Sequence, residues 1–307
     1  MPTRVQLDCY FGGRGDGLSL YTWLIPNPEN WPLLPFIRKY DVSIAVAFLL
    51  LIGLVITWIT VGPNEALRAF VAEAVILAAT FYIARQYLPW EDAGKERVKK
   101  PKLELALAIA AYIMLLVWAS EYFTGGSRIP ALALSLLLPI AVLAIGRYGR
   151  MSWGLRWPAG RELLVLGVIV IINIVLGQLL GRVLPEGELP VPEGADLAAG
   201  GVAGMFAGLV SVLIVAAIPE ELFFRVFLQP RLAHFISGRW ALFLQAVLFS
   251  LAHFPQHYLG WGYPLPYAGA QVLILSNGIM AGYFWRKTGN LPLLILLHLF
   301  FFPRYGL

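Results

Sequence analysis

The stretch Ile218-Pro219-Glu220-Glu221-Leu222-Phe223-Phe224-Arg225 places two adjacent carboxylates and an arginine within an apolar part of the chain. An apolar run rich in valine, leucine and isoleucine precedes it, and Val226-Phe227-Leu228 follows it. On a helix, Glu221 and Arg225 lie one turn apart on a shared face, whereas Glu220 points elsewhere. Charged side chains at bilayer depth are costly and rare, so this stretch indicates a functional site.

The chain around this stretch has the composition of an integral membrane protein. Of its 307 residues, 59% are hydrophobic and 13% are charged, and the mean hydropathy is +0.73. Soluble domains carry about 25% charged residues. The net charge of +5 does not indicate a nucleic-acid partner, because the basic residues lie in short loops between apolar runs. We therefore expect a multi-pass protein in a lipid bilayer, located in a bacterial or archaeal cell membrane.

The apolar runs predict an all-α, polytopic bundle of about nine transmembrane helices. The expected spans are 43–61, 66–84, 103–120, 129–146, 162–183, a sixth from about 200 toward the glutamate pair, 240–257, 267–285 and 291–302. The second span is the weakest, because it contains Arg68 and Glu73.

The loops between these spans follow the positive-inside rule if the N-terminus lies inside. The inside loops are then 85–102, 147–161, 225–239 and 286–290, and all of them are basic. The outside loops are 62–65, 121–128, 184–198 and 254–266, and together they hold one lysine or arginine, Arg128. The expected orientation is N-terminus inside and C-terminus outside.

The chain is expected to divide into three parts. Residues 1–42 form a polar leader, residues 43–199 form about five accessory transmembrane helices, and residues 200–307 form the bundle that carries the chemistry.

Polar side chains gather in the last spans. His253 lies late in the seventh span, Asn277 lies in the eighth and His298 lies in the ninth, while the first five spans contain no histidine. Any one of these residues alone is more often structural, and an intramembrane asparagine often bridges two helices. Two histidines beside a carboxylate pair favour chemistry.

The two glutamates differ in their local partners. Glu221 and Arg225 are expected to form an ion pair that cancels charge in a low-dielectric site. The neighbour of Glu220 one turn on is Phe224, so no local partner neutralises Glu220. Glu220 therefore suits the role of a general base.

Four motifs follow one another along the last third of the chain. The residues that form them are Glu220, Glu221 and Arg225; Phe249 and His253; Gly278, Gly282 and Tyr283 through Thr288-Gly289-Asn290-Leu291; and His298. Their order and spacing resemble the CAAX protease and bacteriocin-processing (CPBP, or Abi) family of intramembrane proteases. The resemblance covers roughly 200–302, and residues 1–199 carry no recognised motif.

The resemblance implies an endopeptidase that hydrolyses a peptide bond near the C-terminus of a membrane-associated protein or peptide. It implies that Glu220 acts with His253 to deprotonate the attacking water, and that no cofactor is needed. Glu221 and Arg225 would hold the site and the substrate backbone in place. His298 would donate to the oxyanion, where a fixed donor is worth roughly 3–4 kcal/mol. The substrate classes implied are a prenylated C-terminal motif, a bacterial peptide or an anchored protein tail, and the sequence does not choose between them.

One position departs from the family pattern. Many members carry asparagine or aspartate four residues after the last histidine, and here that residue is Phe302, which cannot donate a hydrogen bond. Three alternatives follow: His298 acts alone, Asn277 or Asn290 substitutes, or catalysis is weakened.

Three other functions stay open. The same scaffold can serve as a non-catalytic maturation or binding partner, which Phe302 favours. A transporter can use intramembrane carboxylates and histidines as proton relays, although the halves of this chain show no internal repeat. A zinc-dependent protease is the third, because two histidines and a glutamate can bind catalytic zinc. Against zinc, the chain lacks a His-Glu-x-x-His motif, and Arg225 disfavours a second positive charge nearby.

The expected spans leave a difference in depth between the catalytic residues. Glu220 and His298 lie about eight residues, or roughly 12 Å, from the inner face, and His253 lies about thirteen residues in. The three can meet only if the sixth helix continues past Glu220 to about Leu228, or if the seventh begins after 240. We then expect the Glu220 carboxylate within one water's reach of a His253 nitrogen.

Overall fold

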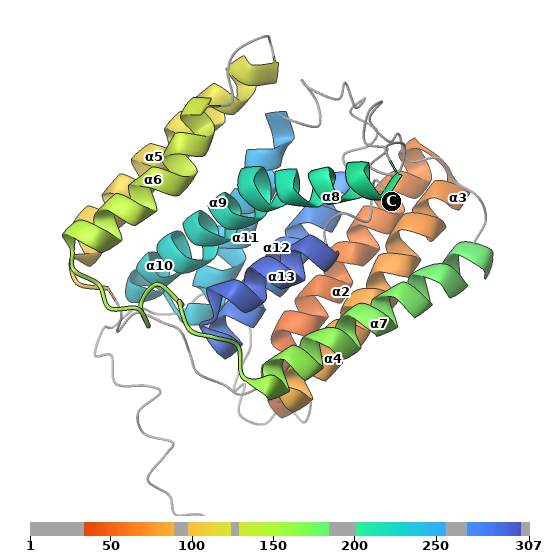
Figure 1. Ribbon diagram of the computed structural model, residues 1–307. Helices are drawn as coiled ribbons and strands as arrows, with labels where there is room; N and C mark the ends of the chain where they lie inside the picture. Colours follow the sequence, from red (N-terminus) through yellow and green to blue (C-terminus); the bar gives the residue numbers. More distant parts are fainter. Residues whose placement is uncertain (1–33, 89–97, 124–128, 184–200, 256–268, 302–307) are drawn as a thin grey trace, which may run out of the picture. The chain divides into compact units, whose positions relative to one another are not determined.

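The computed structural model describes residues 34–88, 98–123, 129–183, 201–255 and 269–301 (Figure 1). Every regular element in these ranges is a helix, which confirms the all-α prediction. The chain divides into two units, Met1–Ile44 and Ala45–Leu307. Apart from residues 34–44, all of the described residues belong to the second unit.

Each expected span overlaps a helix within the described ranges. The helices before the sixth span are α2 (Leu34–Thr60), a run of α3 (Pro63–Ala66), η4 (Leu67–Val71) and α4 (Ala72–Tyr87), then α5 (Pro101–Phe123), α6 (Ile129–Ile145) and α7 (Gly160–Val183). The later helices are a run of α8 (Gly201–Val212), η6 (Leu213–Ala217), α9 (Ile218–Glu220), η7 (Glu221–Leu228) and α10 (Gln229–Phe235), then α11 (Gly238–Pro255), α12 (Gly269–Thr288) and α13 (Leu291–Phe301). Helix α2 begins at Leu34, inside the segment expected to be a polar leader, and residues 1–33 lie outside the described residues.

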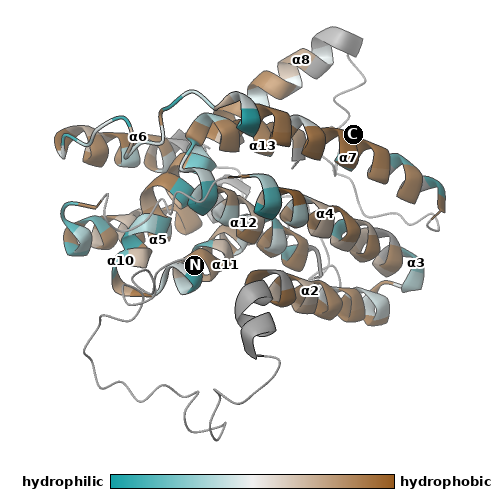
Figure 2. Ribbon diagram, turned by 90° about the horizontal axis from the view of Figure 1, so that it is seen from below, coloured by the Kyte–Doolittle hydropathy of each residue, from teal (hydrophilic) through white to brown (hydrophobic). Residues whose placement is uncertain are grey.

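Several helices are long and apolar enough to cross a membrane. Four described segments qualify by length and composition: Ala69–Tyr87, Pro101–Trp118, Gly160–Leu180 and Phe206–Phe235. Apolar residues dominate most of the helices in Figure 2, and α5 and α7 expose large side chains such as Ile113 and Leu164. The protein is therefore an integral membrane protein. The count of nine spans and their orientation stay predictions.

The sixth helical run continues from Gly201 to Phe235, which is the first of the two options for bringing the catalytic residues together. Two of its segments, η6 and η7, are π-helical, and a proline follows each of them: Pro219 after η6 and Pro230 after η7. Proline lacks a backbone N–H, and its ring clashes with the carbonyl four residues earlier in a regular α-helix. A wider π turn accommodates such a residue, and π turns are frequent at functional sites.

The turn after α10 removes the expected difference in depth. The chain leaves the helix at Ile236, whose backbone is extended (φ −124°, ψ 167°), and α11 begins at Gly238. Glu220 lies fifteen residues before Phe235, and His253 lies fifteen residues after Gly238. The two helices pack against each other as a hairpin. Because Glu220 and His253 are equally far from the turn along the chain, they lie at the same depth along the paired helices.

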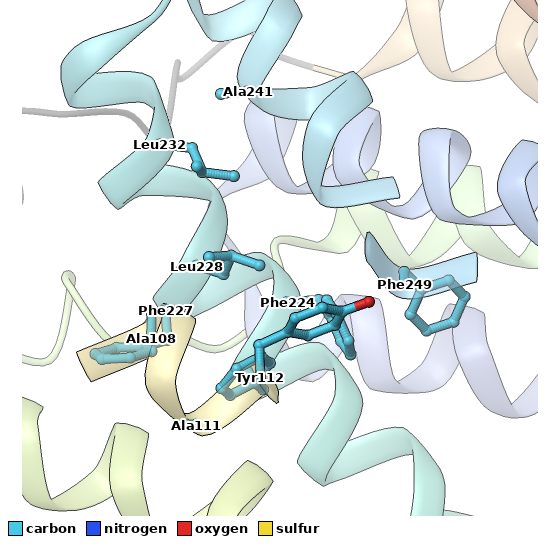
Figure 3. Packing of buried hydrophobic residues seen from close by; sticks show 10 residues of the cluster. Ala108, Ala111, Tyr112, Phe224, Phe227, Leu228, Leu232, Ala241 and Phe249 are labelled. Carbon is cyan, nitrogen blue, oxygen red and sulfur yellow. The ribbon is translucent and has the colours of Figure 1, made fainter. Parts of the chain in front are cut away.

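Small residues bring the helices around η7 into close contact. A Cβ on Gly278 of α12 would lie 3.2 Å from the Cα of Ala246 on α11, so these two helices touch through their backbones. On the other side, Ala108 and Ala111 of α5 pack against the phenylalanines of η7, as Figure 3 shows. This packing fixes η7, which carries Glu221 and begins directly after Glu220.

Candidate active site

The carboxylate of Glu220 lies between two histidines from other helices. Its Oε1 atom is 3.7 Å from Nε2 of His253 on α11, and its Oε2 atom is 4.0 Å from Nε2 of His298 on α13. Both separations exceed a direct hydrogen bond and leave room for one water to contact both side chains. Glu220 therefore lies within one water's reach of His253, as expected from the sequence. The side chains of Glu220 and His253 are about one-fifth exposed, at 22% and 20%.

Glu221 faces different partners and is fully buried. Its Oε1 atom lies 2.7 Å from Nδ1 of His298, and its Oε2 atom lies 3.3 Å from Nε of Arg225. The Arg225 contact was expected from the spacing of one helical turn. The contact with His298 was not, because it joins residues that are 77 positions apart. Glu221 thus orients the His298 ring and connects it to the arginine.

The hydrogen bonds of the two histidines define which ring nitrogens carry protons. Nδ1 of His253 lies 2.9 Å from the carbonyl oxygen of Phe249, and a carbonyl only accepts, so this nitrogen is protonated. In neutral His253, Nε2 is then an acceptor on the side of Glu220. Nδ1 of His298 donates to the Glu221 carboxylate, so Nε2 of His298 carries a proton only when the ring is an imidazolium.

Arg225 is a fully buried cation beside this pair of acids. Its guanidinium carbon lies 4.2 Å from the ring centre of Phe249 and 5.9 Å from that of Phe224. The aromatic face attracts the cation and adds to the ion pair with Glu221. Within the described residues, its nitrogen atoms make no hydrogen bond that meets ordinary geometry. The guanidinium is therefore held by its charge pairing with Glu221 and by the aromatic faces around it.

The two asparagines considered as oxyanion donors lie in different surroundings. Asn290 caps α13: its Oδ1 accepts from the Leu293 N–H at 3.0 Å, and its Nδ2 donates to Glu162 at 3.3 Å. His298 lies eight residues further along, about 12 Å at the rise of an α-helix. The structure therefore gives no support to Asn290 as an oxyanion donor.

Asn277 and Phe302 complete the predicted site residues. Asn277 is buried on α12, and no hydrogen bond joins its Oδ1 to another described residue. Among the described residues, no hydrogen bond joins Asn277 to a carboxylate or a histidine of the site. Phe302 lies outside the described residues.

The zinc alternative stays a prediction from the sequence. Among the side chains that the structure describes, no group of three or more His, Cys, Asp or Glu is placed to hold a metal ion.

The residues that hold the start of α13 were not predicted from the sequence. Arg156 forms a two-pronged ion pair with Glu162, at 2.9 and 2.6 Å, and also donates to the Thr288 carbonyl at 2.8 Å. Glu162 in turn accepts from Asn290 and from the Ala159 N–H. A glutamate at the third position of a helix commonly accepts from the backbone N–H of the N-cap residue, and this pattern can be read from a sequence. The capping role of Glu162 was therefore identifiable. Its long-range partners were not.

The family comparison covers the part of the chain that contains all five expected catalytic residues. Residues 202–301 match the family model described as Type II CAAX prenyl endopeptidase Rce1-like. This confirms the resemblance to CAAX proteases, over about a third of the chain. No curated protein and no solved structure matches the chain. At the level of the family, the match supports an intramembrane protease that acts on a membrane-associated protein.

Proposed function

We propose that this protein is an intramembrane endopeptidase that hydrolyses a peptide bond near the C-terminus of a membrane-associated protein or peptide. The observation that carries the proposal is the position of the Glu220 carboxylate between Nε2 of His253 and Nε2 of His298. Hydrolysis of an amide needs a base, a group that orients the water and a donor for the oxyanion. These side chains supply all three without a cofactor.

The attacking water is held between Glu220 and His253. One O–H points to the Glu220 carboxylate, which takes the proton, and the other O–H donates to Nε2 of His253. The oxygen lone pair is then free to attack the substrate carbonyl carbon. When the C–N bond breaks, protonated Glu220 returns the proton to the leaving nitrogen, so the enzyme ends as it began.

The oxyanion is stabilised from the opposite side by His298. The Glu221 carboxylate accepts from Nδ1 of His298 and orients the ring, and the Nε2–H of the imidazolium form donates to the oxyanion. Arg225 places its positive charge beside the other carboxylate oxygen of Glu221. One such donor contributes about 10²–10³-fold to kcat.

Substitution of Glu220 by glutamine tests the mechanism. Glutamine keeps the shape but cannot accept the proton, so we expect hydrolysis to fall by at least about 10²-fold. The measurement follows a shortened product by mass spectrometry, with prenylated and unprenylated C-terminal peptides added to membranes that contain equal amounts of each protein. His234→Gln is the matched control, because His234 is exposed and lies outside the site.

Full activity of Glu220→Gln would overturn the glutamate mechanism. Loss of wild-type activity in a chelator, restored by zinc, would replace it with the zinc alternative. An inactive wild type on every probe would favour the non-catalytic partner.

The proposal includes nine membrane spans with the N-terminus inside. The basic loop between α6 and α7 supports this orientation, and its Trp157 is 93% exposed. In a Cys9→Ser background, a cysteine at Trp157 should react with a membrane-impermeant maleimide only in opened vesicles. A cysteine at Pro190, in the acidic linker, should react in intact cells. The opposite labelling pattern would invert the topology.

A further inference from the structure

We infer that Arg231 of α10 and Glu104 of α5 form a clamp that positions the π-helical segment η7 for catalysis. Segment η7 carries Glu221 and Arg225 and begins directly after Glu220. The catalytic part of this inference rests on the proposed function. Arg231 touches no reacting atom in the proposed mechanism, so it is a positioning residue.

The clamp begins at the backbone of η7. Pro230 has no N–H, so the turn before it lacks a bond that a regular helix would make. Arg231 supplies donors from its side chain instead: its Nη1 lies 3.1 Å from the Val226 carbonyl oxygen and 2.9 Å from that of Phe227. Its guanidinium also stacks over the Phe227 ring at 4.2 Å. Arg231 therefore holds the C-terminal end of η7 in its wide turn.

Glu104 holds the other side of the same guanidinium. Its Oε2 accepts from Nη2 of Arg231 at 2.6 Å and from Nε at 3.0 Å. The side chains of Arg231 and Glu104 are only 2% and 5% exposed. The guanidinium is planar, and it donates to the two carbonyls from Nη1 and to the carboxylate from Nε and Nη2. These bonds fix its orientation, and a lysine cannot make the same set of bonds.

Glu104 is itself held in place by the start of α5 and by the loop after α6. Its Oε1 accepts from the Tyr148 hydroxyl at 2.5 Å and from the Lys100 N–H at 3.0 Å. Burial and the hydrogen bond to Glu104 raise the pKa of Tyr148, so its hydroxyl stays protonated and remains a donor. A buried polar network in which the members are bonded rigidifies its surroundings.

The register of η7 decides where its charged residues point. A π turn contains an additional residue compared with an α turn, and each residue of an α-helix turns the chain by about 100°. If η7 relaxed to a regular α-helix, Glu221 would rotate away from His298, and Glu220 from both histidines, relative to α10. The clamp opposes this relaxation, and it uses a carboxylate from outside the residues that match the family model.

The test compares Arg231→Met, Glu104→Gln and the double variant with Lys287→Met. Lys287 is a matched control, because it is another buried cation that caps backbone carbonyls, those of Arg85 and Leu88 at 3.4 and 3.0 Å at the end of α4. With a peptide that the wild type cleaves, Arg231→Met should lower kcat at least tenfold at constant KM. The double variant should lose little more than Arg231→Met, because the pair acts as a unit. Lys287→Met should leave kcat within twofold.

A second readout is independent of catalysis. The chain has four histidines, so ¹⁵N-histidine NMR can resolve the Nδ1 signal of His298, which reports the contact with Glu221. This signal should shift in Arg231→Met and not in Lys287→Met. If Arg231→Met does not accumulate in membranes, Glu104→Gln is judged by the same two readouts.

The outcomes separate the clamp from the proposed function. Unchanged kcat and an unchanged His298 signal in the clamp variants overturn the inference, even if the protein is a protease. If the wild type cleaves no probe, the proposed function fails, and the His298 signal alone decides whether the clamp positions η7.

Discussion

The charge of Arg225 is balanced by Glu221 inside a part of the protein that excludes water. The two side chains are fully buried, their closest atoms are 3.3 Å apart, and Glu221 also bonds His298. A buried ion pair contributes little net stability, because desolvation offsets the attraction between the charges. Removing one partner is far more costly, because it leaves the other charge buried and uncompensated. The proposed mechanism gives this pair a functional reason to exist that net stability does not supply.

This asymmetry predicts the behaviour of substitutions at the pair. Arg225→Met should lower the free energy of unfolding by about 3–5 kcal/mol, because Glu221 is left without its counter-charge. The double variant Glu221→Gln/Arg225→Met should recover most of that stability and remain inactive, because His298 has lost the carboxylate that orients it. Unfolding in detergent by denaturant, together with peptide hydrolysis, measures both effects. A double variant as unstable as Arg225→Met would show that the arginine stabilises the fold by packing alone.

At the scale of the element, α13 depends on its first residues to present His298. Asn290 caps the helix, Glu162 holds Asn290, and the Leu291 N–H donates to the Gly154 carbonyl at 3.0 Å. These bonds fix the start of α13 against the loop before α7. The orientation of His298 follows from the angle at which its helix leaves that loop.

Substitution of Asn290 distinguishes between two roles for this residue, a helix N-cap and an oxyanion donor. Loss of an N-cap costs about 1 kcal/mol, so Asn290→Ala should lower stability by that amount and kcat by less than tenfold. An oxyanion donor would instead cost about 10²–10³ in kcat at unchanged stability. Asn277→Ala is the matched comparison, since the same amide is removed from α12. If Asn290→Ala loses about 10²-fold or more in kcat while Asn277→Ala does not, the capping role is wrong and Asn290 returns as a candidate donor.

The elements were predictable from sequence to the extent that local patterns determine them. Apolar runs located the helices, because the length and polarity of a membrane helix are local properties. The order of the motifs around Glu220, His253 and His298 predicted that these residues meet. The π turns and the clamp partner of Arg231 were not predictable, because hydrogen bonds between Arg231 and Glu104 join positions 127 apart. Pro219 and Pro230 were the local signs of an irregular helix.

At the scale of the whole molecule, the helices before residue 200 take part in holding the site. Glu104 of α5 bonds Arg231, and Glu162 of α7 bonds Asn290. Each contact joins a helix outside the family-matched residues to one inside them. Residues 43–199 were predicted to be accessory. These contacts show that this region also helps to hold the family-matched bundle together.

A division of the chain within the linker 184–198 tests this dependence. Residues 200–307 produced alone should be inactive even when inserted in the membrane, because Arg231 and Asn290 then lack the carboxylates that hold them. Residues 1–199 produced as a separate chain in the same cell should restore activity in part, since packing between the helices does not require the linker. Hydrolysis of the same peptide, normalised to the amount of inserted protein, measures both outcomes. Equal activity of residues 200–307 with and without the first part would mean that the family-matched bundle is complete without it, and that the two contacts stabilise the earlier helices rather than the site.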